Sequence, residues 1–102
     1  MNPELTERYR AAITRALAYV DGDLPVIHAA SEFLTTGTVT TMVEPGHIPA
    51  AGTRERVVTD LEYVLSNLHC CGRHKSWGPL LVSWLDDLEE SLSRYESSRT
   101  HE

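Results

Sequence analysis

LLVSWLDDLEESLSRY, residues 80–95, is the stretch that decides the fold. Apolar side chains recur in it at alternating steps of four and three residues, and such positions share one side of an α-helix. The acidic side chains fall largely on the other side. The stretch therefore predicts an amphipathic helix whose apolar face has to be covered by the rest of the chain. Its apolar positions are Leu81, Leu85, Leu88, Leu92 and Tyr95, with Leu80 and Trp84 widening the stripe.

A similar amphipathic pattern precedes this stretch. Thr53 is a favourable N-cap, and Glu55 suits the first helical turn. Gly72 suits a helix end, and Pro79 suits the first turn of the helix that follows. Because the connection is short, we expect the two helices to be antiparallel neighbours. The apolar positions of the earlier helix are Val57, Leu61, Val64 and Leu68, flanked by Val58 and Leu65.

The N-terminal part of the chain predicts two further helices. Asn2 and Pro3 favour the start of the first, and the DGD segment at residues 21–23 ends it. Asp23 then suits the N-cap of a second helix that Gly37 ends. The short connection predicts another antiparallel pair. The apolar positions are Leu5, Tyr9, Ala12, Ile13, Ala16, Leu17 and Val20 in the first helix, and Val26, Ile27, Ala30, Phe33 and Leu34 in the second.

Between these pairs, residues 38–52 have no helical period and are rich in Thr and Val, then in Gly and Pro. They predict a long loop containing a short extended piece at residues 38–43. Met42, Val43 and Ile48 are apolar side chains in this loop. Such side chains either pack over the bundle as a lid or meet a partner.

These patterns together predict an all-α, compact four-helix bundle-like domain with a long loop, about residues 38–52, between helices 2 and 3. The chain of 102 residues suffices for one hydrophobic core and is too short for two. We therefore expect residues 1–102 to form a single helical domain.

The segment HCCGRH, residues 69–74, brings four potential metal ligands together: His69, Cys70, Cys71 and His74. Structural zinc sites usually draw their ligands from two separated pairs. Here the cysteines are adjacent, and neighbouring side chains on a helix diverge by about 100°. We therefore expect no metal and no other cofactor. One cysteine would lie in the core, the other near the surface, and the histidines at a helix end.

The alternative interpretation is a metal- or thiol-dependent sensor or enzyme centred on residues 69–74. Arg73, His74 and Lys75 place positive charge beside the cysteines, and such charge lowers the pKa of a thiol. Other catalytic classes have little support, because the sequence contains no G-x-S-x-G elbow, no P-loop and no dinucleotide-binding fingerprint. A non-catalytic role is therefore favoured, and enzymatic activity is left open.

Acidic residues gather on the polar side of the last helix. Helical di-metal sites project their carboxylates inward from core positions, so solvated charge explains these acids better. The formal net charge of −6 disfavours direct binding to nucleic acid and favours a protein partner with a basic surface. The acids are Asp86, Asp87, Glu89 and Glu90.

Trp77 and Trp84 are aromatic candidates for an interface, because Trp side chains bury large areas at interface centres. Both also have a structural interpretation. Trp84 lies beside the apolar stripe, and a Trp near a helix start, such as Trp77, often packs that helix onto its neighbour.

The N-terminal segment MNPELTERYR lacks the apolar run of a signal peptide. Nowhere do about eighteen consecutive apolar residues occur, as a spanning helix would require. Adjacent cysteines without a disulfide framework fit a reducing compartment. We therefore expect a cytoplasmic protein that makes no use of a membrane.

The resulting hypothesis is a small non-catalytic interaction module that binds and modulates another macromolecule. One version is a stoichiometric inhibitor whose acidic helical face blocks a basic surface. Another is a homo-oligomer that associates through the stripe of the last helix, whose spacing resembles a coiled-coil seam. The partner-binding candidates are Trp77, Trp84, Met42, Ile48, Asp86, Asp87, Glu89 and Glu90.

Overall fold

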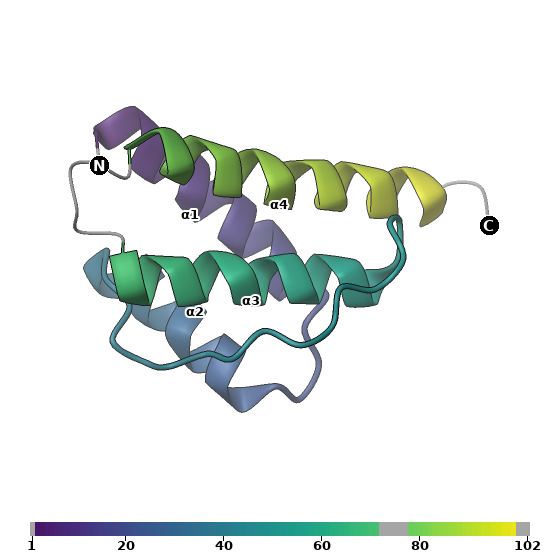
Figure 1. Ribbon diagram of the computed structural model, residues 1–102, viewed down its shortest axis with the longest axis horizontal. Coiled ribbons are helices and arrows are strands. Elements are labelled where there is room, and N and C mark those ends of the chain that lie inside the picture. Colours follow the sequence, from purple (N-terminus) through teal and green to yellow (C-terminus); the bar gives the residue numbers. More distant parts are fainter. Residues whose placement is uncertain (1, 72–77, 100–102) are drawn as a thin grey trace.

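The computed structural model describes residues 2–71 and 78–99 and contains four helices (Figure 1). The all-α fold and the gap at residues 37–53 are thereby confirmed. No strand forms in the described ranges, so the extended piece predicted at residues 38–43 belongs to an irregular segment. The helices are α1 (Pro3–Leu17), α2 (Leu24–Thr36), α3 (Arg54–Cys71) and α4 (Gly78–Arg99).

The predicted N-caps of the first three helices are confirmed. Side-chain oxygens of Asn2, Asp23 and Thr53 accept hydrogen bonds from the backbone N–H groups three residues later, at 2.7, 3.4 and 3.2 Å. These bonds satisfy donors that have no partner inside the helix. Gly37 follows α2 with a φ of 78°, the left-handed conformation that glycine adopts without strain. The predicted end at Gly72 lies outside the described residues.

The first helix ends at Leu17, earlier than the DGD segment that the sequence indicated. The reason lies in tertiary contacts of the residues that follow. The rings of Tyr19 and Tyr95 pack edge to face with centroids 5.0 Å apart, and the Tyr19 hydroxyl donates to Glu96 at 2.8 Å. These contacts with the last helix favour a non-helical turn after Leu17, in place of a further turn of α1.

In Figure 1, α3 and α4 lie side by side and run in opposite directions, as the short connection between them predicts. α1 packs on both of them and on α2. Residues 37–53 run back along α3 from its end to its start. The Val39 carbonyl lies 3.2 Å from His69 Nδ1, and the Pro49 carbonyl accepts from Arg56 at 3.1 Å. The loop is therefore seated on α3 near both ends of that helix.

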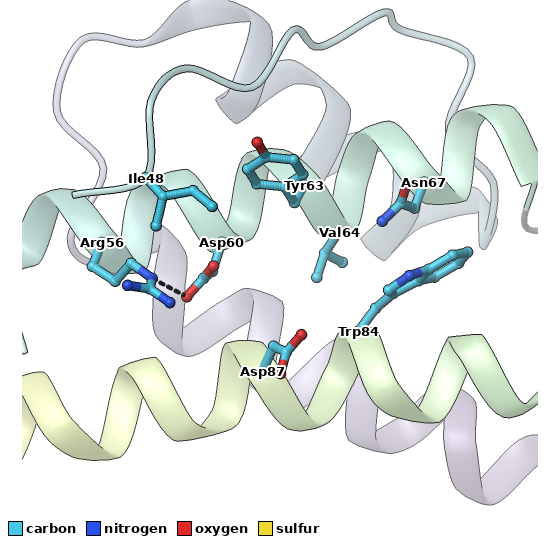
Figure 2. Close-up of a pocket in the computed structure, with 8 residues that line it drawn as sticks. All are labelled: Ile48, Arg56, Asp60, Tyr63, Val64, Asn67, Trp84 and Asp87. Atoms are coloured by element: carbon cyan, nitrogen blue, oxygen red, sulfur yellow. Dashed lines mark hydrogen bonds and ion pairs between the residues drawn. The ribbon is translucent and has the colours of Figure 1, made fainter. Parts of the chain in front are cut away.

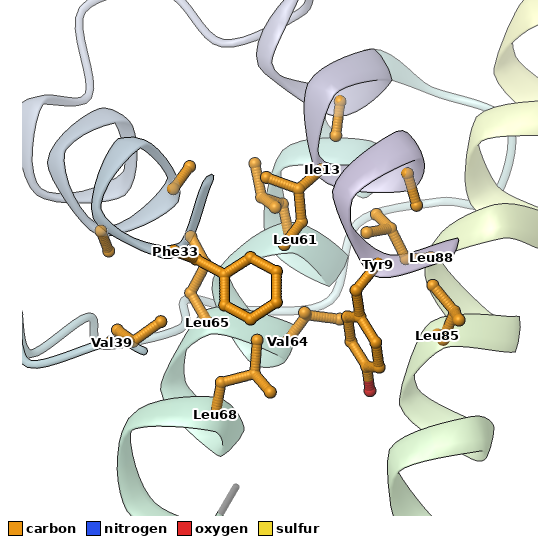
Figure 3. Packing of buried hydrophobic residues seen from close by; sticks show 14 of the residues in the cluster. Tyr9, Ile13, Phe33, Val39, Leu61, Val64, Leu65, Leu68, Leu85 and Leu88 are labelled. Carbon is orange, nitrogen blue, oxygen red and sulfur yellow. The ribbon is translucent and has the colours of Figure 1, made fainter. Parts of the chain in front are cut away.

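The core lies where the four helices meet, and Figure 3 shows the packing around Tyr9 and Phe33. Val39 and Val43 of the loop are also buried. The leucines of the α4 stripe are covered within the chain, since Leu81, Leu85, Leu88 and Leu92 are 0–4% exposed. These leucines therefore offer no exposed surface for the homo-oligomer that the spacing of the stripe suggested. Leu80 is 39% exposed and does not widen the buried face.

Within the described residues, no helix has the length and apolar character needed to cross a membrane.

Candidate functional site: a pocket between α3 and α4

A pocket of about 370 Å³ opens between α3 and α4 (Figure 2). Regular spacing along the helices builds it. The contributing positions on α3 follow steps of four and three residues, and the two on α4 are one turn apart, so each set shares one face. The loop adds one side chain at the edge. The lining residues are Ile48 of the loop, Arg56, Asp60, Tyr63, Val64 and Asn67 of α3, and Trp84 and Asp87 of α4.

Apolar and aromatic groups form much of this lining. Trp84 is half-buried beside the core, and Val64 is buried. Tyr63 and Ile48 remain 38% and 62% exposed. The pocket thus combines the partly buried indole ring of Trp84 with exposed apolar surface that a bound ligand could remove from water.

Asp60 is a carboxylate whose hydrogen-bond and ion-pair partners come from the chain itself. Its Oδ2 accepts from Arg56 Nε at 3.2 Å and also from the Ser91 hydroxyl. The Arg56 guanidinium is held further by the Pro49 carbonyl. The side chain of Asp60 is only 13% exposed, so these partners offset the cost of removing its charge from water.

Asp87 is the contrasting carboxylate in the same pocket. It forms neither a hydrogen bond nor an ion pair with another described residue. Burial, and after it the negative charges of Asp60, Glu90 and Asp86, raise the pKa of Asp87. Arg56, which lines the same pocket, acts in the opposite direction and lowers the pKa in part. Asp87 is therefore a carboxylate without an ion pair among the described residues, and a positive group beside it would be stabilised.

The polar side of the pocket continues into a second cavity of about 180 Å³. It shares Arg56, Asp60 and Asp87 with the first and is also lined by Glu90 and Arg94. Arg94 and Glu90 form an ion pair at 2.9 Å one turn apart on α4. The second cavity thus extends the charged end of the site.

The four acids predicted as one face are divided by the structure. Arg8 of α1 pairs with Asp86 at 3.1 Å and with Glu89 at 2.7 Å. Glu90 is paired with Arg94, so of the four only Asp87 forms no ion pair within the described part of the chain. Whether any of them meets a partner stays a prediction.

Among the other partner-binding candidates, Ile48 and Trp84 come together in the pocket. Met42 is 66% exposed in the loop but does not line the pocket. Trp77 lies outside the described residues. Sequence reasoning did not single out Arg56, Tyr63 and Asn67. The signal that could have found them is their four- and three-residue spacing beside the apolar face of α3.

The HCCGRH cluster is only partly described. His69 and Cys70 are exposed on the last turn of α3, with the His69 ring beside the Val39 carbonyl. His74 and the side chain of Cys71 lie outside the described part. Among the described residues, no three His, Cys, Asp or Glu side chains gather closely enough to hold a metal ion.

Searches for relatives returned no matching family model, curated protein or solved structure.

Proposed function

We propose that this protein is a small non-catalytic interaction module that binds a segment of a partner protein in the pocket between α3 and α4. The observation that carries the proposal is that an aromatic, partly exposed lining lies beside one carboxylate, Asp87, that forms no ion pair with a described residue. Such a combination offers both buried area and orientation to an incoming side chain. The proposal retains Trp84, Ile48 and Asp87 from the sequence-based candidates.

The dimensions and lining suit anchoring side chains. A volume of about 370 Å³ lies near the small end of the range for ligand pockets. Trp and Tyr are the residues that most often dominate binding energy at interfaces, because they bury large areas at low entropic cost. Trp84 and Tyr63 occupy such positions here. A short segment that inserts one or two side chains would use the pocket well.

The lining gives less support to catalysis. Ser91 lies beside Asp60, but no histidine is found among the described residues that line the two cavities. A serine nucleophile usually needs such a base within hydrogen-bonding reach. A binding role uses the groups that are present without requiring a further one.

Modulation of the partner would follow from occupancy, because a segment held in the pocket is withheld from other ligands. In this form of the inhibitor hypothesis, Asp87 replaces the four-residue acidic face as the electrostatic determinant. We do not propose self-association through the α4 stripe, because its leucines are buried within the chain. A cytoplasmic setting is part of the proposal, since adjacent cysteines suit a reducing compartment.

The proposal is tested by comparing three forms of the protein in affinity purifications from the native host. Trp84→Ala removes the aromatic wall, whereas Leu24→Ala alters an exposed apolar residue that does not line the pocket. We expect a partner that the wild type and Leu24→Ala retain and Trp84→Ala loses. Equal recovery by all three folded proteins would place binding elsewhere and contradict the proposal.

A further inference from the structure

We propose that the occupant of the pocket is an arginine side chain of the partner segment, with its guanidinium between the Trp84 ring and the Asp87 carboxylate. The proposal deepens the function proposed above and rests on it. Figure 2 shows Trp84 and Asp87 directed from α4 toward α3, with Asp60 approaching from the opposite helix. A side chain entering between the helices would meet the indole ring and the free carboxylate together.

Charge selects a cation as the occupant. Asp60 already has Arg56 and Ser91 as partners, while Asp87 has none among the described residues. Burial first, and then the charges of neighbouring acids, disfavour the ionised form of Asp87 and raise its pKa, although Arg56 partly offsets them. A positive group would relieve this repulsion, whereas an anion would add to it.

The described arginines that line the two cavities are already bound to other groups. Arg56 is held by Asp60 and by the Pro49 carbonyl at 3.1 Å. Arg94 donates to Glu90 through both its Nε and an NH₂ group, at 3.2 and 2.9 Å. Turning either toward Asp87 would break existing bonds. A cation from outside the chain forms its contact with Asp87 without that loss.

Arginine fits this environment better than lysine. Its planar guanidinium stacks on aromatic faces and binds a carboxylate through two parallel N–H groups. Its aliphatic stem can pack on apolar surface such as that of Tyr63 and Ile48. Contact between a guanidinium and aromatic rings also occurs within this chain, where the Arg99 guanidinium lies 5.4 Å from the ring centroid of Tyr19 and 5.6 Å from that of Tyr95.

The direct test uses three small probes and nuclear magnetic resonance. N-acetylarginine amide is titrated into the whole protein, followed at the Trp84 indole N–H and the Asp87 backbone N–H. N-acetylcitrulline amide keeps the stem but is neutral, and N-acetyllysine amide keeps the charge without the planar group. We expect saturable millimolar binding of the arginine probe and affinity lower by about tenfold or more for citrulline. Equal binding of citrulline or of lysine would overturn the assignment to arginine.

Matched variants locate the effect. Asp87→Asn is isosteric at an exposed position and is expected to remain folded while losing at least about tenfold in affinity for the arginine probe. Glu89→Gln neutralises a nearby acid that Arg8 already pairs, and is expected to bind the probe as the wild type does. Loss of affinity in Glu89→Gln with retention in Asp87→Asn would overturn the proposed site.

Partner capture separates failure of this inference from failure of the proposed function. If Trp84→Ala and Asp87→Asn both lose the partner, both proposals are supported. If only Trp84→Ala loses it, the pocket remains the docking site and the arginine assignment is overturned. If neither variant loses it, both proposals are overturned.

Discussion

The two flanks of α4 carry similar acids in opposite circumstances. On the flank that faces α1, Asp86 and Glu89 share the Arg8 guanidinium, and Glu96 is paired with Arg15. On the flank that faces α3, Asp87 forms no ion pair with a described residue, and Arg56 offsets its charge only in part. We call the first the closed flank, because cations of the chain pair with its acids. We call the second the open flank, because Asp87 forms no ion pair there.

This difference separates structural charge from charge available to a ligand. A carboxylate beside a cation of its own chain gains little from a second cation, because its attraction is already partly satisfied. An unpaired, partly desolvated carboxylate gains more. Pairing within the chain therefore separates the acids of α4, and acidic composition alone does not. Arg8 of α1 pairs with Asp86 and Glu89, and Arg94 of α4 pairs with Glu90. Asp87 forms no ion pair with a described residue.

The largest expected effect comes from loosening the packing of α4, the helix that carries both flanks. Leu88 is fully buried, and Leu88→Ala should lower the free energy of unfolding by about 3 kcal/mol, through lost burial and the cavity left behind. Urea denaturation measures it. Leu24→Ala, at a position 73% exposed, is the control and should change stability by less than about 0.5 kcal/mol. A Leu88→Ala cost no larger than that of the control would mean that α4 is not seated as described.

The next effect concerns the closed flank alone. The Tyr9 hydroxyl is buried and donates to the Leu81 carbonyl of α4. Tyr9→Phe should destabilise the protein by about 1 kcal/mol. Burial raises the pKa of Tyr9, so the folded state disfavours its ionisation. The wild type should therefore lose stability as the pH rises above about 10, and Tyr9→Phe should lose less. Denaturation followed at increasing pH checks both statements, and identical pH profiles would contradict them.

A smaller effect is expected for the ion pairs of the closed flank. Arg8→Gln leaves Asp86 and Glu89 without their shared cation, but all three side chains are partly exposed. We expect a fall of a few degrees at most in Tm, shrinking in high salt because exposed pairs are screened. Thermal unfolding at low and high salt is the measurement. A large, salt-independent fall would show a different role for Arg8.

On the open flank, removing a charge should not lower Tm as Arg8→Gln does on the closed flank. The raised pKa of Asp87 means that the folded state binds the proton more tightly than the unfolded state. Its contribution to stability is therefore present at low pH and is lost as the pH rises from about 3.9 through the folded pKa. Asp87→Asn should leave Tm at neutral pH unchanged or slightly raised. A clear fall in Tm would mean that the chain does provide Asp87 with a partner.

The smallest effect on global stability is expected at the loop that carries Ile48. Glu32 accepts hydrogen bonds from the backbone N–H groups of Thr40 and Thr41 at 2.7 and 3.1 Å. Bonds from Thr40 lower the pKa of Glu32 to about 2. Its stabilising contribution is thus present above about pH 4.5 and is lost as the pH falls through about 2.

Glu32→Gln should therefore accelerate hydrogen exchange at the Thr40 and Thr41 amides at neutral pH, with little change in the global unfolding curve. Thr35→Ala, which alters an exposed hydroxyl bonded within α2, is a matched control and should leave those amides protected. Unchanged exchange in Glu32→Gln would mean that this carboxylate does not hold the loop.

Much of the fold could be predicted from local patterns. The caps at Asn2, Asp23 and Thr53 depend on residues only three positions away, and the stripe of α4 depends on a simple spacing. The end of α1 could not be predicted in the same way, because Tyr19 bonds to Glu96 far along the chain. Local signals decide where helices start, and a distant contact moved this helix end.

The site was less predictable for the same reason. Asp86 and Asp87 are adjacent in sequence, and only the approach of Arg8 from α1 distinguishes them. Ile48 joins the pocket because the loop is seated along α3, which its Gly- and Pro-rich sequence does not specify. Trp84 was found as an aromatic beside the stripe, but its role as a pocket wall required the packed helices.

The central claim is that the open flank of α4, and not the closed one, binds the partner. It is tested most directly by the dissociation constant of the purified partner with two matched charge neutralisations. We predict that Asp87→Asn weakens binding by at least about tenfold and Glu89→Gln by no more than about twofold. Equal losses, or a larger loss for Glu89→Gln, would contradict the claim.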